Sequence, residues 1–284
     1  MHVFVGLGFC KDQGPFFAVD SCQDASRTRG QYFLDQKNIQ LQLSSHNHCI
    51  GYYDLLQVKD YPCPENAAVS SASKTHQCPT CFQRTGFRPA FYNHDSDDLS
   101  VQQKQYNQRP HDVYLAAFDH GHVKVGIAYH NRLWARWAEQ GARKASVIQQ
   151  CSDAYEARSL EQSIQKNFKI PDRVTMSVKK RALRTYDPMT TQMQLLMTKR
   201  HVLKSLQRDD QRTEIVEMDP AYRLQALSAY FLEETQVSDR NPKIEGQFYG
   251  MIGSLLFIKT SDHDTLSMID LQPYRGRLNV VLWG

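Results

Sequence analysis

The stretch DVYLAAF at residues 112–118, followed by DHG at 119–121 and HVKVGIA at 122–128, decides the fold of the central part of the chain. Both runs are rich in apolar residues, and the segment between them contains a glycine. Two such runs joined by a short glycine-containing turn are typical of a β-hairpin. The stretch therefore predicts two antiparallel strands near the middle of the 284-residue sequence.

The residues after this hairpin predict two helices separated by a strand. Strong helix formers surround Arg132 and Arg136, which are one helical turn apart and so share a face. The next glycine is expected to end this helix. A strand is expected at about residues 145–149 and a second helix at about residues 153–168, with Glu161 beside the apolar face of that helix.

Four of the seven cysteines lie in one window before the hairpin, at Cys49, Cys63, Cys78 and Cys81. The last two form a Cys-Pro-Thr-Cys pair, which lets two thiolates from one tight turn bind the same tetrahedral ion. Residues 61–84 are rich in proline, serine and threonine, so they need a stabilising interaction other than a hydrophobic core. The pattern predicts a structural Zn²⁺ site, and the alternative is a set of buried thiols.

Three histidines flank these cysteines and could each replace one thiolate: His46, His48 and His76. Because four thiolates already close a structural site, we expect all three histidines to lie outside the coordination sphere. The remaining cysteines, Cys10, Cys22 and Cys151, have no partner at metal-binding spacing, and we expect them to be buried or inert.

Positive charge is concentrated in one segment, although the net charge of the whole chain is only +4. Residues 173–212 contain ten lysines and arginines against three acidic residues. Apolar residues at helical spacing leave many of these cations on one side, as expected of a surface that binds a nucleic-acid backbone. The candidate contacts are Lys179, Lys180, Arg181 and Arg184, together with Lys124 in the hairpin. A solvated helix face is the alternative interpretation.

The predicted elements favour an α+β fold in four parts. Residues 1–95 are expected to form a β-rich zinc-binding module, which a polar stretch at 93–109 follows. Residues 110–172 are expected to form a small sheet flanked by helices, 173–236 a basic helical segment, and 237–284 a small C-terminal β-module.

Several classes of protein lack their sequence signatures here. The apolar opening at residues 3–9 is too short for a secretory signal, and the apolar run at 251–258 is well below the roughly 20 residues that cross a bilayer. We therefore expect a cytoplasmic protein with no membrane partner. There is no phosphate-binding loop, His-Glu-x-x-His helix or Gly-x-Ser-x-Gly elbow, which argues against nucleotide hydrolysis, zinc proteolysis and α/β-hydrolase chemistry.

Seven short motifs lie along the chain: Cys49-Ile50-Gly51-Tyr52, Pro62-Cys63-Pro64, Gln77-Cys78-Pro79-Thr80-Cys81-Phe82, Val113-Tyr114-Leu115-Ala116, Lys124-Val125-Gly126, Glu139-Gln140-Gly141-Ala142 and Leu160-Glu161. Together they resemble a bacterial and archaeal family described as a domain of unknown function, with an N-terminal four-cysteine zinc motif. The core of that family looks like the GIY-YIG nuclease superfamily, and the resemblance spans most of the chain. It implies that residues 110–172 form a GIY-YIG-like core.

In the GIY-YIG superfamily, a small three-stranded sheet presents one tyrosine from each of two strands. The next helix supplies an arginine, and a glutamate binds a divalent metal ion. The resemblance places these roles on Tyr114, on Arg136 or Arg132, and on Glu161, with Mg²⁺ or Mn²⁺ as the catalytic ion. Such a set is chemically sensible, because arginine neutralises charge on a phosphate and a hard carboxylate holds Mg²⁺.

The second tyrosine position of the superfamily falls on Val125, and valine cannot transfer a proton. This departure bears directly on whether the chain can hydrolyse a phosphodiester. Lys124 and His130 are the candidates to take over proton transfer or phosphate contact, because both side chains can act near neutral pH when their pKa is perturbed.

Each catalytic candidate also has a structural alternative. Tyr114 could pack within the sheet, the arginines could pair with glutamates, and Glu161 could pair with Arg158 or Lys166 on its own helix. The leading hypothesis is a zinc-stabilised protein that acts on a phosphodiester of DNA or RNA, as a metal-dependent endonuclease or as a binder derived from one. The alternatives are a non-catalytic DNA- or RNA-binding module and a partner-binding structural protein.

Overall fold

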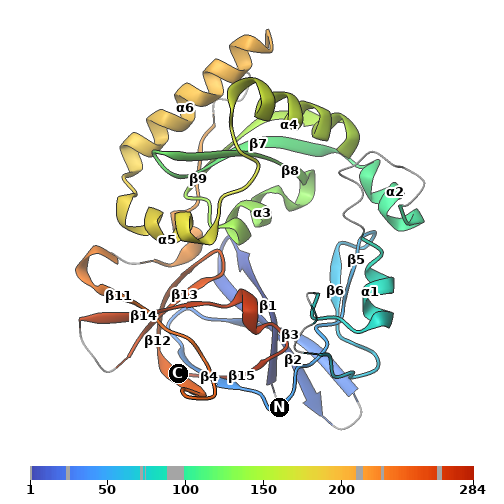
Figure 1. The fold of residues 1–284 in the computed structure, drawn as a ribbon, viewed down its shortest axis with the longest axis vertical. Coiled ribbons are helices and arrows are strands. Elements are labelled where there is room, and N and C mark those ends of the chain that lie inside the picture. Colours follow the sequence, from blue (N-terminus) through green and yellow to red (C-terminus); the bar gives the residue numbers. More distant parts are fainter. Residues whose placement is uncertain are drawn as a thin grey trace. The chain divides into compact units, whose positions relative to one another are not determined.

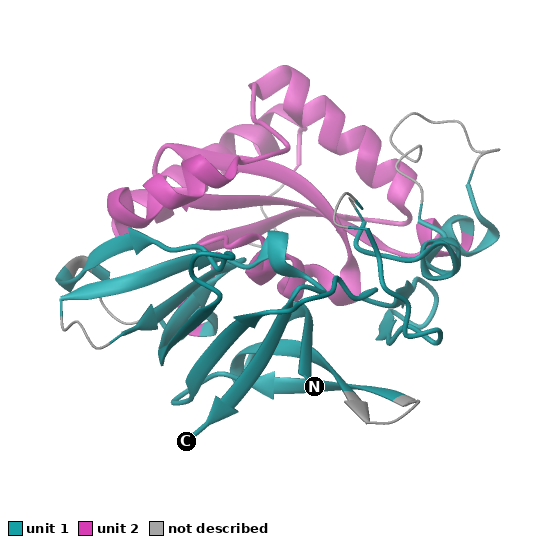
Figure 2. Ribbon diagram, turned by 60° about the horizontal axis from the view of Figure 1, so that its bottom comes forward, with its two compact units in different colours: residues 1–104, 221–284 teal, residues 105–220 magenta. Residues whose placement is uncertain are grey.

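The computed structural model describes residues 2–23, 26–70, 73, 75–87, 99–208, 214–224, 227–260 and 264–284. Strands and helices both contribute to the structure, and the fold is α+β, as predicted (Figure 1). Two compact units make up the chain: unit 1 contains residues 1–104 and 221–284, and unit 2 contains residues 105–220 (Figure 2). Residues 93–98 of the polar stretch predicted at 93–109, and residues 209–212 of the basic stretch at 173–212, lie outside the described residues. The rest of the polar stretch contains a short helix, Val101–Asn107.

Unit 1 is built around a nine-stranded sheet with the strand order β11-β14-β13-β12-β4-β15-β1-β2-β3. The strands β11 and β14 are parallel, and the other neighbours are antiparallel. The bounds of the strands are β1 His2–Cys10, β2 Gly14–Gln23, β3 Ser26–Phe33, β4 Asn38–Leu43, β11 Phe231–Glu234, β12 Lys243–Ile252, β13 Leu255–Lys259, β14 Thr265–Asp270 and β15 Leu278–Trp283.

The middle strand β4 shows why the sequence forms this sheet. Ile39 and Leu41 are fully buried, whereas the glutamines that follow each of them are partly or fully exposed, as expected for a half-buried strand with a two-residue period. On its two sides β4 pairs with β12 and with β15. The strands predicted near the C-terminus therefore belong to the same sheet as those predicted near the N-terminus.

A long connection after β4 contains the four clustered cysteines, and we call residues 44–87 the cysteine loop. Its regular elements are β5 Tyr52–Asp54, β6 Lys59–Tyr61 and α1 Pro79–Thr85. The strands β5 and β6 pair in a small antiparallel ribbon. Gly51 has a φ of 79°, and any side chain there would meet the carbonyl oxygen of Tyr61. Glycine is therefore required where the chain enters this ribbon.

Unit 2 contains a four-stranded antiparallel sheet with the order β10-β9-β7-β8. Its strands are β7 His111–Asp119, β8 His122–Tyr129, β9 Lys144–Cys151 and β10 Val216–Glu217. The strands β7 and β8 form the predicted hairpin, in which Tyr114 lies opposite Gly126 and Leu115 lies opposite Val125. The strand β7 is central, and each of its residues is buried.

The helices of unit 2 follow the sequence prediction in the first half of the unit. Helix α3 Leu133–Gln140 ends at Gly141, which has a φ of 75°. Helix α4 Ala154–Phe168 begins after Asp153, whose carboxylate accepts hydrogen bonds from two backbone amides of the first turn. The apolar face of α4 packs with strands β7–β9 and with helix α6 in one core. The strand and helix predicted after α3 are thus confirmed.

The remaining helical elements are α2 Val101–Asn107, α5 Met176–Thr185, α6 Pro188–Ser205 and α7 Asp219–Tyr222, with short 3₁₀ helices at His130–Arg132, Leu227–Ala229 and Gln272–Tyr274. Among the described residues, no helix combines the length and the apolar character needed to span a membrane.

Candidate functional site

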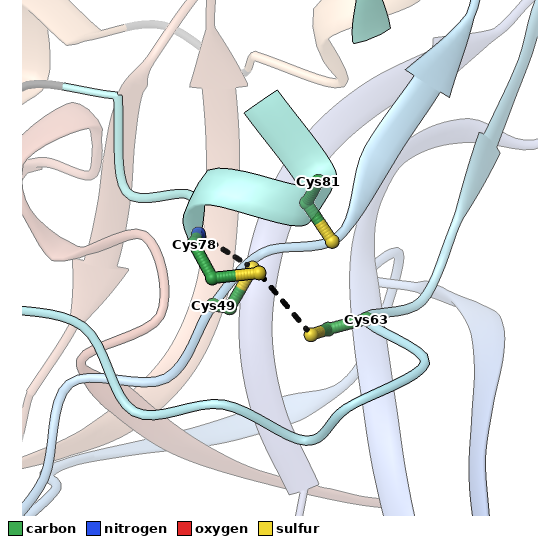
Figure 3. A group of neighbouring side chains, drawn as sticks. All are labelled: Cys49, Cys63, Cys78 and Cys81. Carbon is green, nitrogen blue, oxygen red and sulfur yellow. Dashed lines mark hydrogen bonds between the residues drawn. The ribbon is translucent and has the colours of Figure 1, made fainter. Parts of the chain in front are cut away.

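The four predicted cysteine ligands meet inside the cysteine loop (Figure 3). Cys49 follows β4, Cys63 follows β6, and Cys78 and Cys81 lie at the start of α1. All four are buried, and their sulfur atoms lie within 4.8 Å of one another. Cys63 Sγ and Cys78 Sγ are 3.9 Å apart, close to the roughly 3.8 Å that a tetrahedron with Zn–S bonds of about 2.3 Å requires. The four thiols can hold a structural metal ion such as zinc.

The local backbone explains how the pair from α1 reaches one point. Cys78 has extended dihedral angles just before the helix, and Pro79 begins the first turn. Cys81 then lies within the first turn, so its sulfur returns to the side of Cys78. The Gly86 residue closes the short helix in the left-handed conformation, with a φ of 63°.

The sulfur cluster has the electrostatics of an anionic site. The backbone amides of Gly51 and Cys78 point at Cys49 Sγ, at 3.4 and 3.2 Å. Burial raises the pKa of the Cys49 thiol to about 11, and burial together with the neighbouring Cys49 raises the pKa of Cys81. Four thiolates could not coexist here without a cation between them, whereas a divalent ion would compensate their charge.

The three flanking histidines lie outside this cluster. Among the described residues, the group of clustered ligands contains only the four cysteines. His48 Nδ1 instead lies 3.1 Å from an Arg27 nitrogen, and His46 Nδ1 lies 2.8 Å from Ser45 Oγ. Of the other cysteines, Cys151 is buried and Cys10 is partly exposed, while the side chain of Cys22 lies outside the described residues.

An arginine clamp fixes the cysteine loop to the sheet of unit 1. Asp20 on β2 is fully buried and accepts two hydrogen bonds from Arg29 on β3, at 2.8 and 3.1 Å. The same guanidinium donates to the carbonyl oxygen of Ile50 at 2.7 Å, and Arg27 donates to that of Cys49 at 2.8 Å. The Asp20 carboxylate therefore orients two arginines, and these hold the segment that contains Cys49, the first of the four clustered cysteines.

Replacement of Asp20 by asparagine should loosen this clamp, because asparagine retains the shape but removes the charge that the arginines pair with. We expect the free energy of unfolding to fall by about 2 kcal/mol, the scale of a hydrogen bond to a charged group. Urea denaturation with tryptophan fluorescence measures this change. The control is Asp239→Asn, at an exposed position of the same unit; an equal loss in both variants would contradict a specific role for Asp20.

In unit 2, Tyr114 stands at the centre of the second candidate site. Its side chain is completely buried, and its hydroxyl donates to Gln140 Oε1 at 3.1 Å. The ring packs edge-on against Trp137 of α3. A side chain at Gly126, directly across the hairpin, would overlap the phenol ring. The phenol thus fills a space that the adjacent strand leaves open only because it carries glycine there.

Val125, on which the resemblance places the second tyrosine position, lies on the face of the sheet opposite to Tyr114. Val125 is fully buried and belongs to the apolar core formed with α4 and α6. Since side chains alternate along a strand, Lys124 projects to the face on which Tyr114 lies. Its Nζ lies 5.9 Å from the centroid of the Tyr114 ring and donates to the carbonyl oxygen of Asp172 at 3.0 Å. The residue that faces the tyrosine is therefore Lys124.

Electrostatic contacts bring Arg136 and Glu161 to the same place. Burial raises the pKa of Tyr114 to about 12; Arg136 and the hydrogen bond to Gln140 lower it, and Glu161 adds to the rise. Burial also lowers the pKa of Lys124 to about 8, assisted by Arg136 and opposed by Glu161. Tyr114 and Lys124 thus each lie within electrostatic range of both Arg136 and Glu161.

Glu161 is nearly buried and forms an ion pair with Arg158 on the same helix, as the structural alternative anticipated. Burial raises the pKa of Glu161, and the hydrogen bond from Arg158 opposes this rise. The guanidinium of Arg132, the other candidate arginine, forms an ion pair with Glu139 at 2.5 Å. Arg136 lies within electrostatic range of Tyr114.

Apart from Lys124 on β8, the predicted basic contacts lie on the short helix α5 and differ in their surroundings. The Lys179 ammonium group lies 5.4 Å from the ring centroid of Phe118 and acts on the pKa of Lys124. Arg181 lies 3.4 Å from His122 Nε2. Arg181 and Arg184 are exposed, whereas Lys179 and Lys180 are partly buried.

The sequence reasoning missed Gln140 and Asp172. Gln140 follows Arg136 by one helical turn and so shares its face, a signal that the spacing of the two residues contained. Asp172 contributes a backbone carbonyl and a nearby negative charge to Lys124. Its position depends on the loop after α4, and no residue pattern indicated it. The predicted His130 pairs with the buried Asp112, at 2.6 Å.

Residues 36–276 match the protein family described as "Protein of unknown function (DUF2797)". The chain belongs to this family. Both the cysteine cluster and the cluster around Tyr114 fall within the matched residues. The comparisons with curated proteins and with solved structures find no significant match.

Proposed function

We propose that unit 2 binds a phosphodiester of DNA or RNA at the cluster of Tyr114, Lys124, Arg136 and Glu161, and cleaves it as a GIY-YIG-like, metal-dependent endonuclease. The observation that carries this proposal is the convergence of the four side chains from four separate elements, β7, β8, α3 and α4. A small sheet with these helices beside it also supports the resemblance to the GIY-YIG core.

The charge of the cluster suits an anionic phosphodiester. Lys124 and Glu161 interact electrostatically with more cations than acids. The cations, Lys124 included, are Lys124, Arg136, Arg158 and Lys179, and the acids are Glu161 and Asp172. Partly buried cations attract a phosphate more strongly than fully solvated ones, because the local dielectric is lower. The exposed Arg136 and the basic helix α5 give the backbone of a nucleic acid further contacts.

The pKa values of Tyr114 and Lys124 support different chemical roles for these two side chains. With a pKa of about 12, Tyr114 keeps its proton at neutral pH, and its hydroxyl positions Gln140 through the hydrogen bond that it donates. Lys124, with a pKa of about 8, is mostly charged at neutral pH but can release its proton to a leaving oxygen. Arg136 stabilises charge that develops on the phosphate. Glu161 is the carboxylate that would bind Mg²⁺ or Mn²⁺, which supplies further stabilisation of that charge.

We also propose that Zn²⁺ is the ion held by Cys49, Cys63, Cys78 and Cys81. Four sulfur ligands at tetrahedral spacing are typical of zinc sites that hold structure and leave no open coordination position. The ion would then order the cysteine loop and take no part in cleavage.

The test of the proposed activity is incubation with labelled single- and double-stranded DNA and RNA in Mg²⁺, in Mn²⁺ and in a chelator. We expect cleavage by the wild type in the presence of metal. The variants Arg136→Ala and Glu161→Gln should each reduce the rate by about 10- to 150-fold, the range of a hydrogen bond to a charged group. Arg240→Ala, at an exposed position of unit 1, is the control. Equal rates in all variants would argue against the site.

A non-catalytic nucleic-acid-binding role is the second candidate, and one observation favours it. Glu161, the carboxylate to which the metal ion is assigned, already forms an ion pair with Arg158. If this ion pair persists in the complex, Glu161 does not bind a divalent ion. In that case Glu161→Gln leaves affinity for nucleic acid unchanged, whereas Arg136→Ala weakens it, and no cleavage is seen with any metal.

A further inference from the structure

One face of the sheet in unit 1 carries three rows of side chains that run across neighbouring strands. Directly paired residues of antiparallel strands project to the same side of a sheet. The rows across β15, β4 and β12 are Asn279–Gln42–Lys243, Val281–Gln40–Glu245 and Trp283–Asn38–Gln247. We call these nine residues the amide face. None of them is buried, whereas the alternate residues Val280, Leu41 and Ile244 face the core.

The composition of the amide face is unusual for a solvated sheet. Five of its side chains are amides, and within the described part of the chain none of these five side chains makes a hydrogen bond. The Asn279 Oδ1 atom is shielded from solvent and likewise has no partner. Asparagine is depleted in strands, so strand propensity does not explain why Asn38 and Asn279 lie on adjacent strands. Apart from Asn279, whose Oδ1 atom is shielded, each of these amides offers a ligand both a donor and an acceptor.

The charged and aromatic groups are placed at the two ends of this face. Lys243 and Glu245 form an ion pair at 2.7 Å and so leave the middle of the face neutral. Trp283, at one end, is 40% exposed, beside Val281 at 47%. Arg277 lies at the other end, in the turn just before β15, about 20 Å from Trp283 at 3.4 Å per residue. Its guanidinium has no ion-pair or hydrogen-bond partner among the described residues, and His76 lies within electrostatic range of it.

We propose that the amide face, from Arg277 to Trp283, binds a single-stranded nucleic acid. Arg277 contacts a backbone phosphate, the amides bond to the edges of unpaired bases, and one base stacks on Trp283. A flat aromatic ring with unpaired amides beside it fits exposed bases, which have both a planar face and mixed donors and acceptors. A duplex hides its base faces by stacking, so it cannot use Trp283. The inference rests on the proposed nucleic-acid function and names single strands as its substrate class.

The test is fluorescence anisotropy of the full chain with fluorescein-labelled oligouridine and oligothymidine of about 12 nucleotides, a site size within the range of known single-strand binders, and with a duplex of equal length. Binding is measured at several salt concentrations. The variants are Trp283→Ala, Trp283→Phe and Arg277→Gln. The matched controls are Phe231→Ala, an aromatic residue of unit 1 that is 66% exposed, and Arg240→Gln, an exposed arginine of the same unit.

We expect single strands to bind more tightly than the duplex, and Trp283→Ala to weaken single-strand binding by about 5- to 150-fold, the range for one stacked base. Trp283→Phe should retain most of the affinity, because a ring remains. Arg277→Gln should reduce the slope of log affinity against log salt by about 0.7, as expected for one lost phosphate contact. Both controls should bind as the wild type does.

Two results would overturn the inference, and they are distinguishable. If Trp283→Ala and Arg277→Gln bind like the wild type while Arg136→Ala binds weakly, the amide face is not the contact, and the proposed function of unit 2 stands. If the wild type binds no oligonucleotide, both proposals fail. Circular dichroism identifies a misfolded variant; should Trp283→Ala misfold, the comparison of Trp283→Phe with Arg277→Gln still decides the question.

Discussion

Replacement of Cys81 by serine is expected to abolish metal binding and to unfold the cysteine loop. Serine offers a hard hydroxyl that remains protonated, so the tetrahedral site loses one of its four ligands. The loop has few apolar residues of its own, and the buried side chains at its centre are the four cysteines. Metal-ligand free energy is folding free energy in such a segment, on the order of 10 kcal/mol for small zinc domains. The sheet of unit 1 has a separate apolar core and should remain folded.

Two measurements check this expectation. Mass spectrometry of the metal content should show about one zinc ion per wild-type chain, as a closed four-sulfur site requires, and almost none in Cys81→Ser. Hydrogen exchange should accelerate in residues 49–82 and stay slow in strand β4. Cys10→Ser is the control, because Cys10 lies away from the cluster. A wild type without metal, or a variant with unchanged metal content, would remove the basis for a zinc site.

Replacement of Lys124 by methionine is expected to reduce phosphodiester cleavage by about 100- to 1,000-fold. This is the range for removal of one preorganised charge-stabilising donor in a shielded site. The effect should exceed that of Arg136→Ala, because Lys124 is only 8% exposed whereas Arg136 is exposed. Methionine keeps the volume of the lysine stem, so the sheet should be undisturbed. Cleavage rates measured alongside the thermal unfolding temperature separate the loss of charge from a loss of structure.

The titration of Lys124 predicts in which direction cleavage activity changes with pH. Burial and Arg136 lower the pKa of Lys124 to about 8. Below that pH the side chain is charged and can contact a phosphate or donate its proton; above it the charge is lost. Activity should therefore decline as the pH rises through about 8, and Lys124→Arg should remove this decline because arginine stays charged. Lys166→Met on the exposed side of α4 is the control. Activity that rises through the same pH range would assign Lys124 the opposite role, that of a general base.

The local parts of the fold were predictable because their signals lie close together in the sequence. The hairpin of unit 2, the helix that ends at Gly141 and the cysteine pair at the start of α1 each depend on fewer than about 20 neighbouring residues. The face of a strand is harder to assign. Tyr114 pairs with Gly126, so alternation would have placed Lys124 beside it, but the motif alone suggested Val125.

The nine-stranded sheet could not be predicted in the same way, since its pairings join residues far apart in the chain. No local pattern says that Gln42 of β4 lies opposite both Asn279 and Lys243. The burial of Ile39 and Leu41 on the other face of β4 selects these pairings. This burial is gained only when the strands have come together. The same limit applies to Asp20, whose role is visible only when Arg27 and Arg29 lie next to it.

The pairing of β4 with β12 and β15 also sets an order for folding during synthesis. Unit 2 is one continuous stretch, residues 105–220, and all of its strands are synthesised before β12. Unit 1 must wait, because β4 has neither of its neighbours until residues 243–283 have been translated. Until then both edges of β4 lack a partner strand and can pair with other chains, which is a known route to aggregation. A nascent chain truncated before β12 should therefore bind chaperones through β4, while its unit 2 is already folded.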